Sequence, residues 1–237
     1  MTKKRSAECF FVFVGKNFSI LLKKCLRFDI ISMYVQFLIA VRQNFVGGKR
    51  KMKTWEELYE DCASCERCEL HKTRTNCVFG VGNREADILF VGEAPGEKED
   101  LSGTPFVGRA GQLLDKFLYA VDISREDVYI ANILKCRPPK NRDPKPDEED
   151  ACMGYLREQV RLIRPKMIVC LGRISAQRLI DPNYRITKEH GTWVKKGDFL
   201  MTAVYHPALL LRDPRKKEEM LEDMKTIKAK LDEMKNN

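Results

Sequence analysis

Four cysteines in this chain form two separated pairs whose spacing could build a metal site. Cys65 and Cys68 stand as a Cys-x-x-Cys, and fifteen residues separate Cys136 from Cys152. Thiolates are soft ligands, so a set of four suits zinc or an iron–sulfur cluster. A Cys-x-x-Cys also fits a redox dithiol, and its spacing alone does not decide between these chemistries. Because the pairs lie far apart in the sequence, the fold would have to assemble the site.

The start of the chain indicates the cellular compartment of the protein, and the compartment in turn indicates the state of its cysteines. The apolar run at 9–14 is too short for a signal peptide, and no small-residue cleavage site follows it. We therefore expect a cytoplasmic, reducing environment, where cysteines bind metal more often than they form disulfides. Cys62 and Cys77 flank the Cys-x-x-Cys and are rival ligands. Cys170 lies in the apolar run 167–171 and is expected to be a buried side chain.

The net charge of +9 is unevenly distributed. Residues 1–51 hold eleven Lys and Arg against two acidic residues, which accounts for the whole excess. Residues 52–237 hold 32 basic and 32 acidic residues and are formally neutral. The basic isoelectric point therefore does not describe the folded part of the chain, and any DNA affinity must come from local clusters.

The composition also divides the chain into an extension, 1–51, and a domain, 52–237. Residues 1–51 show no clear helical or strand period, and their longest apolar run is too short to span a membrane. Met52 precedes a helix start in which Thr54 and Glu57 can form a capping box. We therefore predict that Met52 is the biological start, which peptides from 1–51 in the native protein would contradict. A disordered or membrane-surface arm is the alternative.

Short apolar runs alternate with helical patterns along the domain. The runs lie at 87–91, 128–133, 167–171 and 199–205, and the helical patterns at 110–120, 147–163 and 175–180. This alternation predicts βαβ units and a parallel sheet with both faces covered. The tail from residue 215 carries one apolar stripe, which predicts a helix packed on the domain.

Chemically informative segments follow three of the predicted strands. Gly92 opens a Gly-Glu-Ala-Pro-Gly turn, the second run leads through Asn132 to Cys136-Arg137-Pro138-Pro139, and His206 follows the last run. Ligands of parallel sheets bind at the carboxyl ends of the strands. Any one of these residues alone is more often structural, but three at one sheet edge predict a functional site. His71 and His190 are expected to be surface or structural residues.

Together with the four cysteines, these segments resemble the iron–sulfur (family 4) uracil-DNA glycosylases. The matching motifs are Gly92–Asp100, Pro105–Gly111, Lys135–Pro139 and His206–Ala208. The resemblance runs from about Thr54 to about Lys230. It implies a three-layer α/β/α fold with a four-stranded parallel sheet. It also implies base-excision repair of DNA, in which hydrolysis of the deoxyuridine N-glycosidic bond releases uracil and leaves an abasic site.

The resemblance assigns roles to individual residues. It implies a [4Fe-4S] cluster held by Cys65, Cys68, Cys136 and Cys152. Asn132 would present a donor and an acceptor to uracil O4 and N3–H, and Phe106 would stack on the flipped base. His206 would donate toward uracil O2 as the glycosidic bond breaks. Backbone N–H groups of the Gly92-Glu93-Ala94 turn would assist.

One motif position departs from better-known uracil glycosylases. Where they carry a water-orienting aspartate, this chain has Ala94. We expect Glu93 to take that role, and the alternative is a water held mainly by the backbone. Glu99 is expected to line the pocket and to help exclude the 5-methyl group of thymine.

DNA contacts are expected from a basic, proline-rich loop and from apolar residues after His206. The predicted phosphate ligands are Arg109, Lys135, Arg137, Lys140 and Arg142. Leu209 and Leu210 are candidates for the space that the flipped base leaves.

Three other interpretations stay open at this stage. The chain could be a zinc-bound nucleic-acid module without catalysis, a redox iron–sulfur protein, or a related glycosylase with wider base preference. We expect a monomer that acts on uracil-containing DNA and does not associate with membranes. Contact with a sliding clamp stays open, as does the choice between single- and double-stranded DNA.

Overall fold

The computed structural model describes residues 53–236. The predicted extension at 1–51 and the start at Met52 lie outside these residues and stay predictions.

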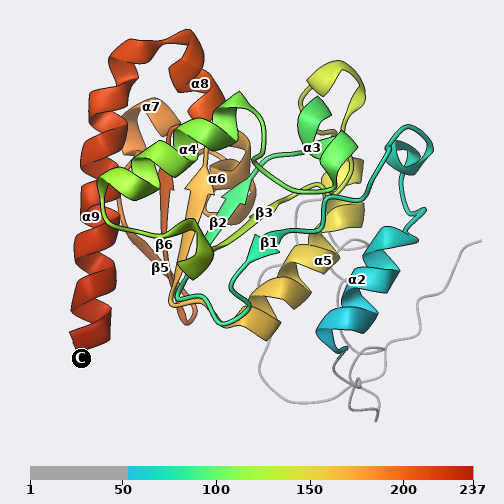
Figure 1. The fold of residues 1–237 in the computed structure, drawn as a ribbon, viewed down its shortest axis with the longest axis horizontal. Coiled ribbons are helices and arrows are strands. Elements are labelled where there is room, and N and C mark those ends of the chain that lie inside the picture. The colour runs from blue at the N-terminus through green and yellow to red at the C-terminus, as the bar shows by residue number, and fades with distance from the viewer. Residues whose placement is uncertain (1–52, 237) are drawn as a thin grey trace, which may run out of the picture. The chain divides into compact units, whose positions relative to one another are not determined.

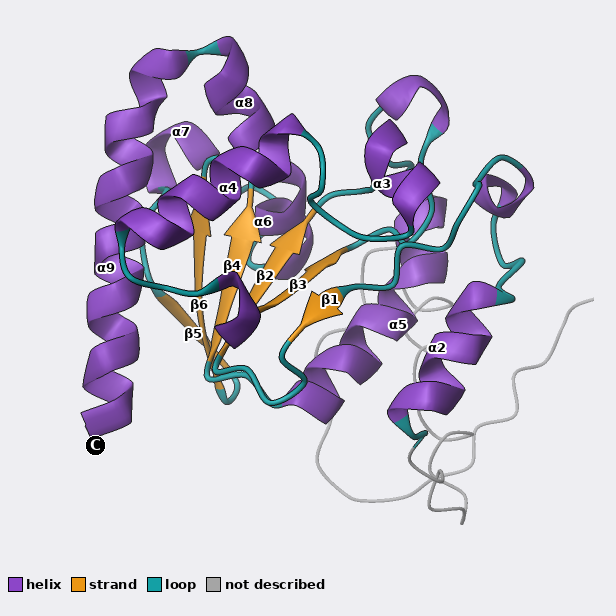
Figure 2. Ribbon diagram, in the orientation of Figure 1, coloured by secondary structure: helices purple, strands orange, loops and turns teal. Residues whose placement is uncertain are grey.

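Within residues 53–236, six strands form one sheet in the order β1-β3-β2-β4-β6-β5 (Figure 2). The strands are β1 Val81–Gly82, β2 Ile88–Gly92, β3 Tyr129–Asn132, β4 Met167–Leu171, β5 Val194–Lys196 and β6 Phe199–Val204. The predicted four-stranded parallel sheet is confirmed as the centre, β3-β2-β4-β6. Two antiparallel edge strands, β1 and β5, add to it. Both are short and exposed, so they carry no apolar run that the sequence could reveal.

Helices cover both faces of the sheet, which confirms the three-layer architecture (Figure 1). Successive residues of β2 alternate between two cores: Leu89 and Val91 face one, Ile88 and Phe90 the other. The first core is shared with α2 (Trp55–Ala63), α5 (Pro146–Ile163) and α6 (Arg173–Leu179). The second is shared with α4 (Arg109–Ala120), α8 (Pro207–Arg212) and α9 (Lys217–Asn236).

Shorter helices complete the connections between these elements. They are η1 Glu69–Lys72, α3 Glu97–Ser102, η2 Arg125–Asp127, η3 Pro139–Asn141, α7 Ile186–Glu189 and η4 Pro214–Lys216. None of the helices in the described part of the chain has the length and apolar character that a membrane crossing requires.

Both helix signals singled out in the sequence are confirmed. At the start of α2, the Thr54 hydroxyl accepts from the Glu57 N–H at 3.1 Å, and the Glu57 carboxylate accepts from the Thr54 N–H at 2.8 Å. The stripe of α9 is buried, because Met220, Met224 and Ile227 have no exposed surface. Capping fixes where α2 begins, and burial of the stripe holds α9 on the sheet.

Candidate active site

A cavity of about 550 Å³ opens at the carboxyl ends of the parallel strands. Each of the four strands contributes a lining residue at or just beyond its end: Glu93 after β2, Asn132 from β3, Gly172 after β4 and His206 after β6. The predicted convergence of these segments is therefore observed. Ala94, Glu99, Phe106 and Leu209 also line the cavity.

Asn132 lies at the floor of this cavity and is only 2% exposed. Its Oδ1 atom is buried without a hydrogen-bond partner. A Cβ added to Gly92 would lie 2.3 Å from that oxygen and 2.7 Å from Phe106 Cζ. Glycine at position 92 is therefore what leaves space for both side chains.

Phe106 is held by its own loop in an uncommon backbone conformation, with φ at 55°. The Oε1 atom of Glu99 accepts the N–H groups of Val107 at 3.0 Å and Gly108 at 2.8 Å, which fixes this loop. Gly111 lets α4 approach, since a Cβ there would lie 1.7 Å from the Phe106 carbonyl oxygen. Glu99 thus supports the Phe106 loop, and its predicted effect on thymine stays a prediction.

His206 caps α8, and the cap determines its tautomer. Its Nδ1 atom accepts the Ala208 N–H at 3.1 Å. Burial lowers the pKa of His206 to about 4, with the Arg212 cation adding to the effect and Glu99 opposing it. The ring is therefore neutral near pH 7, and its single proton is on Nε2. Nε2–H is thus free to serve as a donor.

Glu93 is a half-buried carboxyl group in the same cavity. Its pKa is raised to about 7, chiefly by burial and in addition by the Asp143 carboxylate, while the Arg173 cation opposes the rise. A carboxyl group with this pKa exchanges protons near neutral pH, as a general base requires.

The cavity also contains charged residues that were not predicted as site residues from the sequence. Arg173 and Asp143 line it and form an ion pair at 2.7 Å, and Arg212 lies on its rim. Arg173 directly follows Gly172 at the end of β4, so the strand-end rule could have identified it. Asp143 and Arg212 lie in a loop and a short helix with no comparable signal.

The prediction that Lys135 contacts DNA is wrong. Lys135 is 1% exposed, and its ammonium group donates to the carbonyls of Phe79 and Asn132 and to Gln159 Oε1. All three of its donors are used inside the domain, so the cation is not available to a phosphate.

The other predicted phosphate ligands differ in their surroundings. Arg109 and Lys140 are exposed. Arg137 donates to Asn141 Oδ1 at 2.8 Å. Arg142 makes a two-pronged contact with Glu148, at 2.9 and 2.5 Å, which offsets its charge. Their DNA contacts stay predictions.

The prediction that Leu210 inserts into DNA is also wrong. Leu210 has no exposed surface and belongs to the second core, whereas Leu209 is 38% exposed. Neighbouring residues of a helix point in different directions, so only one of the two can face the cavity rim.

The predicted metal ligands line a second, much smaller cavity. Cys65 and Cys68 reach it from the segment between α2 and η1, Cys136 from the basic loop and Cys152 from α5. Arg74 donates to Cys136 Sγ, and the Lys135 N–H to Cys152 Sγ, each at 3.2 Å. Among the described residues, no three His, Cys, Asp or Glu side chains come together closely enough for a single metal ion.

The other cysteines of the described residues are Cys62, Cys77 and Cys170, and two of them, Cys62 and Cys170, are buried. Cys62 also borders this second cavity. Its Sγ atom contacts Cys77 Sγ at 3.2 Å, so the two rival ligands pair with each other. Cys170 has no exposed surface, as predicted.

Comparisons with known proteins agree with this architecture. Residues 79–227 match the family profile of the uracil DNA glycosylase superfamily. The chain is 48% identical over 186 residues to the type-4 uracil-DNA glycosylase of Archaeoglobus fulgidus, covering 74% of this chain and 92% of that protein. The type-4 enzyme of Thermotoga maritima is 44% identical over 188 residues, covering 75% and 97%. That of Sulfurisphaera tokodaii is 43% identical over 186 residues, covering 75% and 84%.

The fold thus defines an α/β protein with a cavity at the carboxyl ends of its parallel strands. The chain belongs to the uracil DNA glycosylase superfamily, and the resemblance to its type-4 enzymes is confirmed.

Proposed function

We propose that this chain excises uracil from DNA in base-excision repair. It hydrolyses the N-glycosidic bond of deoxyuridine, releases uracil and leaves an abasic site. The observation that carries this proposal is the buried, unpaired Oδ1 atom of Asn132 at the floor of the cavity. Such an atom costs about 1–3 kcal/mol in the absence of a partner. A base flipped into the cavity would supply the missing donor.

The donor and acceptor pattern of Asn132 favours uracil over cytosine. Oδ1 would accept from uracil N3–H, and the amide NH₂ would donate to O4. Cytosine has no proton on N3, so it would leave Oδ1 unpaired. Phe106, beside Asn132 and Gly92, offers a ring for stacking, an interaction of about 1–3 kcal/mol per base.

Bond cleavage places negative charge on the departing base. As the C1′–N1 bond breaks, its electron pair passes to the uracil ring and accumulates at O2. The Nε2–H of neutral His206 would stabilise that charge. A water oxygen then bonds to C1′ and gives its proton to the Glu93 carboxylate, and the uracil anion is protonated on release.

We also infer that Cys65, Cys68, Cys136 and Cys152 hold a [4Fe-4S] cluster. The four thiols line one cavity without forming a site for a single ion, as ligands of a larger group would. Two N–H donors point at sulfur atoms, a contact that also tunes iron–sulfur clusters. When bound, the cluster would supply metal–thiolate bonds that tie α2 and α5 to the loop after Asn132.

Base release from uracil-containing oligonucleotides tests the proposed function. The wild-type protein should release uracil from U·G and U·A duplexes, and neither hypoxanthine nor thymine from matched substrates. Asn132→Ala should lower the rate about tenfold to a hundredfold, since two contacts to the base are lost.

The matched control is Thr202→Val. Thr202 carries the other buried, unpaired side-chain oxygen that the described residues contain, and it does not line the cavity. This variant should retain the wild-type rate. No uracil release by the wild-type protein, together with bound zinc and no visible absorbance, would instead favour the non-catalytic nucleic-acid module.

A further inference from the structure

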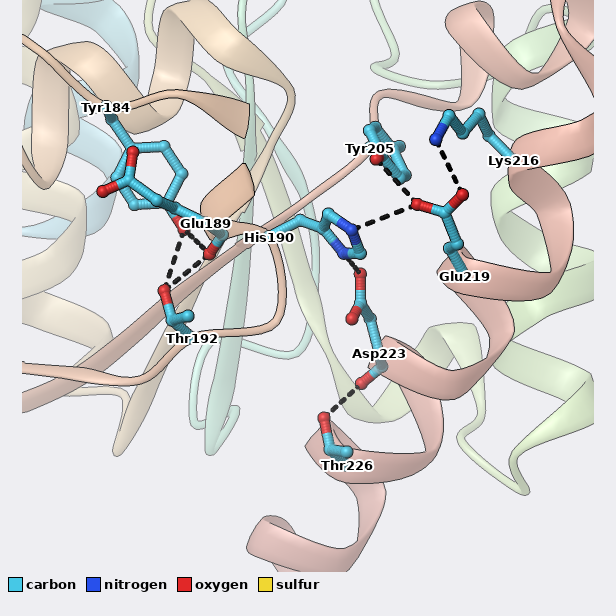
Figure 3. A network of polar contacts seen from close by, with 9 residues as sticks. All are labelled: Tyr184, Glu189, His190, Thr192, Tyr205, Lys216, Glu219, Asp223 and Thr226. Atoms are coloured by element: carbon cyan, nitrogen blue, oxygen red, sulfur yellow. Dashed lines mark hydrogen bonds and ion pairs between the residues drawn. The ribbon is translucent and has the colours of Figure 1, made fainter. Parts of the chain in front are cut away.

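His190 is the centre of a polar network that connects the C-terminal helix to the pocket wall (Figure 3). Its Nδ1 atom lies 2.7 Å from Asp223 Oδ2, and its Nε2 atom lies 3.2 Å from Glu219 Oε2. Both acidic residues belong to α9. The Nδ1 contact is a hydrogen bond to Asp223, and the Nε2 contact brings the other edge of the ring against the Glu219 carboxylate.

The surroundings of Glu219 favour its ionised form. Lys216 Nζ donates to Glu219 Oε1 at 2.7 Å, and the Tyr205 hydroxyl donates to Oε2 at 2.9 Å. These two hydrogen bonds, that of Lys216 first, lower the pKa of Glu219. His190 thus faces an established anion on its Nε2 side, with Lys216 as the neighbouring cation.

The network reaches the active-site cavity through Tyr205. The ring centroids of His190 and Tyr205 are 4.5 Å apart. Tyr205 is fully buried and borders the cavity, and it directly precedes His206. Ile186, another lining residue, accepts the His190 N–H at 3.3 Å. His190 therefore contacts two parts of the wall that carries the catalytic histidine.

Glycine after His190 makes this close approach to α9 feasible. Gly191 has φ at +72°, and a Cβ there would lie 2.3 Å from Asp223 Oδ1. Its N–H donates to the Ala203 carbonyl of β6 at 2.9 Å. The turn is thus pressed between the strand that leads to His206 and the helix that supplies the two carboxylates.

We propose that His190 is a positioning residue for base excision. Clamped between Asp223 and Glu219, it fixes Tyr205 against α9 and thereby sets the location of the His206 ring. The inference rests on the proposed function and adds to it a residue that lies outside the cavity. It predicts that loss of the clamp slows the chemical step while DNA binding persists.

The test compares His190→Gln with a control variant in α9, the helix that supplies the two carboxylates. Single-turnover rates would be measured at saturating uracil-containing duplex, well below the unfolding midpoint of each variant. His190→Gln should lower the rate about tenfold to a hundredfold, the scale of a small displacement of a catalytic group, with Kd for DNA within twofold of wild type. Ile227→Val removes one methylene from a buried α9 residue and should lower stability but leave the rate unchanged.

Two outcomes would overturn the proposal: a wild-type rate in His190→Gln, or equal rate losses in His190→Gln and Ile227→Val. Asp223→Asn probes the same contact without removing the ring, and it should lower the rate in the same direction. A wild-type rate there would also count against the clamp.

A spectroscopic measurement separates this inference from the proposed function. Nitrogen-15 NMR of the His190 ring should show a hydrogen bond at Nδ1 that Asp223→Asn weakens, and an unchanged Nδ1 signal in that variant would contradict the clamp. Failure of the wild-type protein to release uracil would refute the proposed function, whereas the Nδ1 hydrogen bond is measured without substrate.

Discussion

The Nδ1 atom of His206 accepts the backbone N–H of Ala208 at 3.1 Å, so the N-cap residue of α8 is also the donor at the cavity. One hydrogen bond therefore serves two purposes: it caps the helix and leaves the ring proton on Nε2. The low pKa of His206, about 4, keeps the ring in this neutral form at the pH of the cell.

The two purposes of His206 can be separated by mutation. Asparagine is a good N-cap, so His206→Asn should retain the helix cap and lose the Nε2–H donor. We expect the rate to fall about 10²- to 10³-fold with little change in the unfolding midpoint. His206→Ala should lose both. A single-turnover assay and thermal unfolding of the two variants make the comparison, and a wild-type rate in His206→Asn would exclude the donor role.

The raised pKa of Glu93 predicts a pH dependence of activity. If the ionised carboxylate takes the proton of water, the rate should rise with pH and level off above about 7. Glu93→Gln should lower the rate about a hundredfold and abolish this rise. Full activity in both Glu93→Gln and Glu93→Ala would remove Glu93 from the mechanism and leave the backbone-held water.

The same group has the opposite effect on stability. The folded-state pKa lies above the ordinary value of 4.5, so the folded protein binds more protons than the unfolded chain between these values. The contribution of Glu93 to stability should therefore decrease as pH rises from about 4.5 to about 7. For His206, whose pKa is lowered from 6.5 to about 4, stability should instead decrease as pH falls through that interval. Urea midpoints of Glu93→Gln and wild type across this pH range check the first sign.

Removing the charge of Lys135 should affect stability, whereas removing the charge of Lys140 should affect DNA binding. Lys135→Met removes three buried hydrogen bonds, of which only the one to Phe79 has a second donor in place, and it should destabilise the fold by about 3 kcal/mol or more. Exposed Lys140→Gln should leave stability unchanged and reduce the slope of log Kd against log salt by about 0.9, if it contacts a phosphate. DNA titrations at several salt concentrations measure the slope, and an unchanged slope would remove Lys140 from the interface.

Leu209 and Leu210 form a second contrasting pair. Leu209→Ala should lower excision from duplex DNA more than from single strands, because only a duplex has a base stack to fill. Leu210→Ala should cost about 2–5 kcal/mol of stability, with equal effects on both substrates. Equal effects of Leu209→Ala on the two substrates would contradict insertion of Leu209 into the space that the flipped base leaves.

Periodicity and strand-end positions predicted most of the fold and the centre of the site. Apolar runs identified all four parallel strands, and the motifs after them supplied Glu93, Asn132 and His206. These features are local, because a buried strand and the residue that follows it are adjacent in the sequence.

The directions of individual side chains were much harder to predict from the sequence. The sequence from Leu209 to Leu211 is apolar throughout, so it does not reveal which leucine faces the core. Lys135 lies in a cationic loop, but its side chain turns inward to meet Phe79 and Gln159, which are far from it in sequence. The same limit applies to Asp143 and His190, whose partners come from other elements.

Gly92 contributes no functional group, yet it determines what the cavity can contain. A single methyl group there would overlap the amide of Asn132 and the ring of Phe106. Substitution at this position would displace the Asn132 amide and the Phe106 ring, and it would thereby disrupt base binding without removing any reactive group from the chain. A chain with Gly92→Ala could thus bind DNA through an intact surface without completing repair, and it would offer a way to trap the step before the base enters.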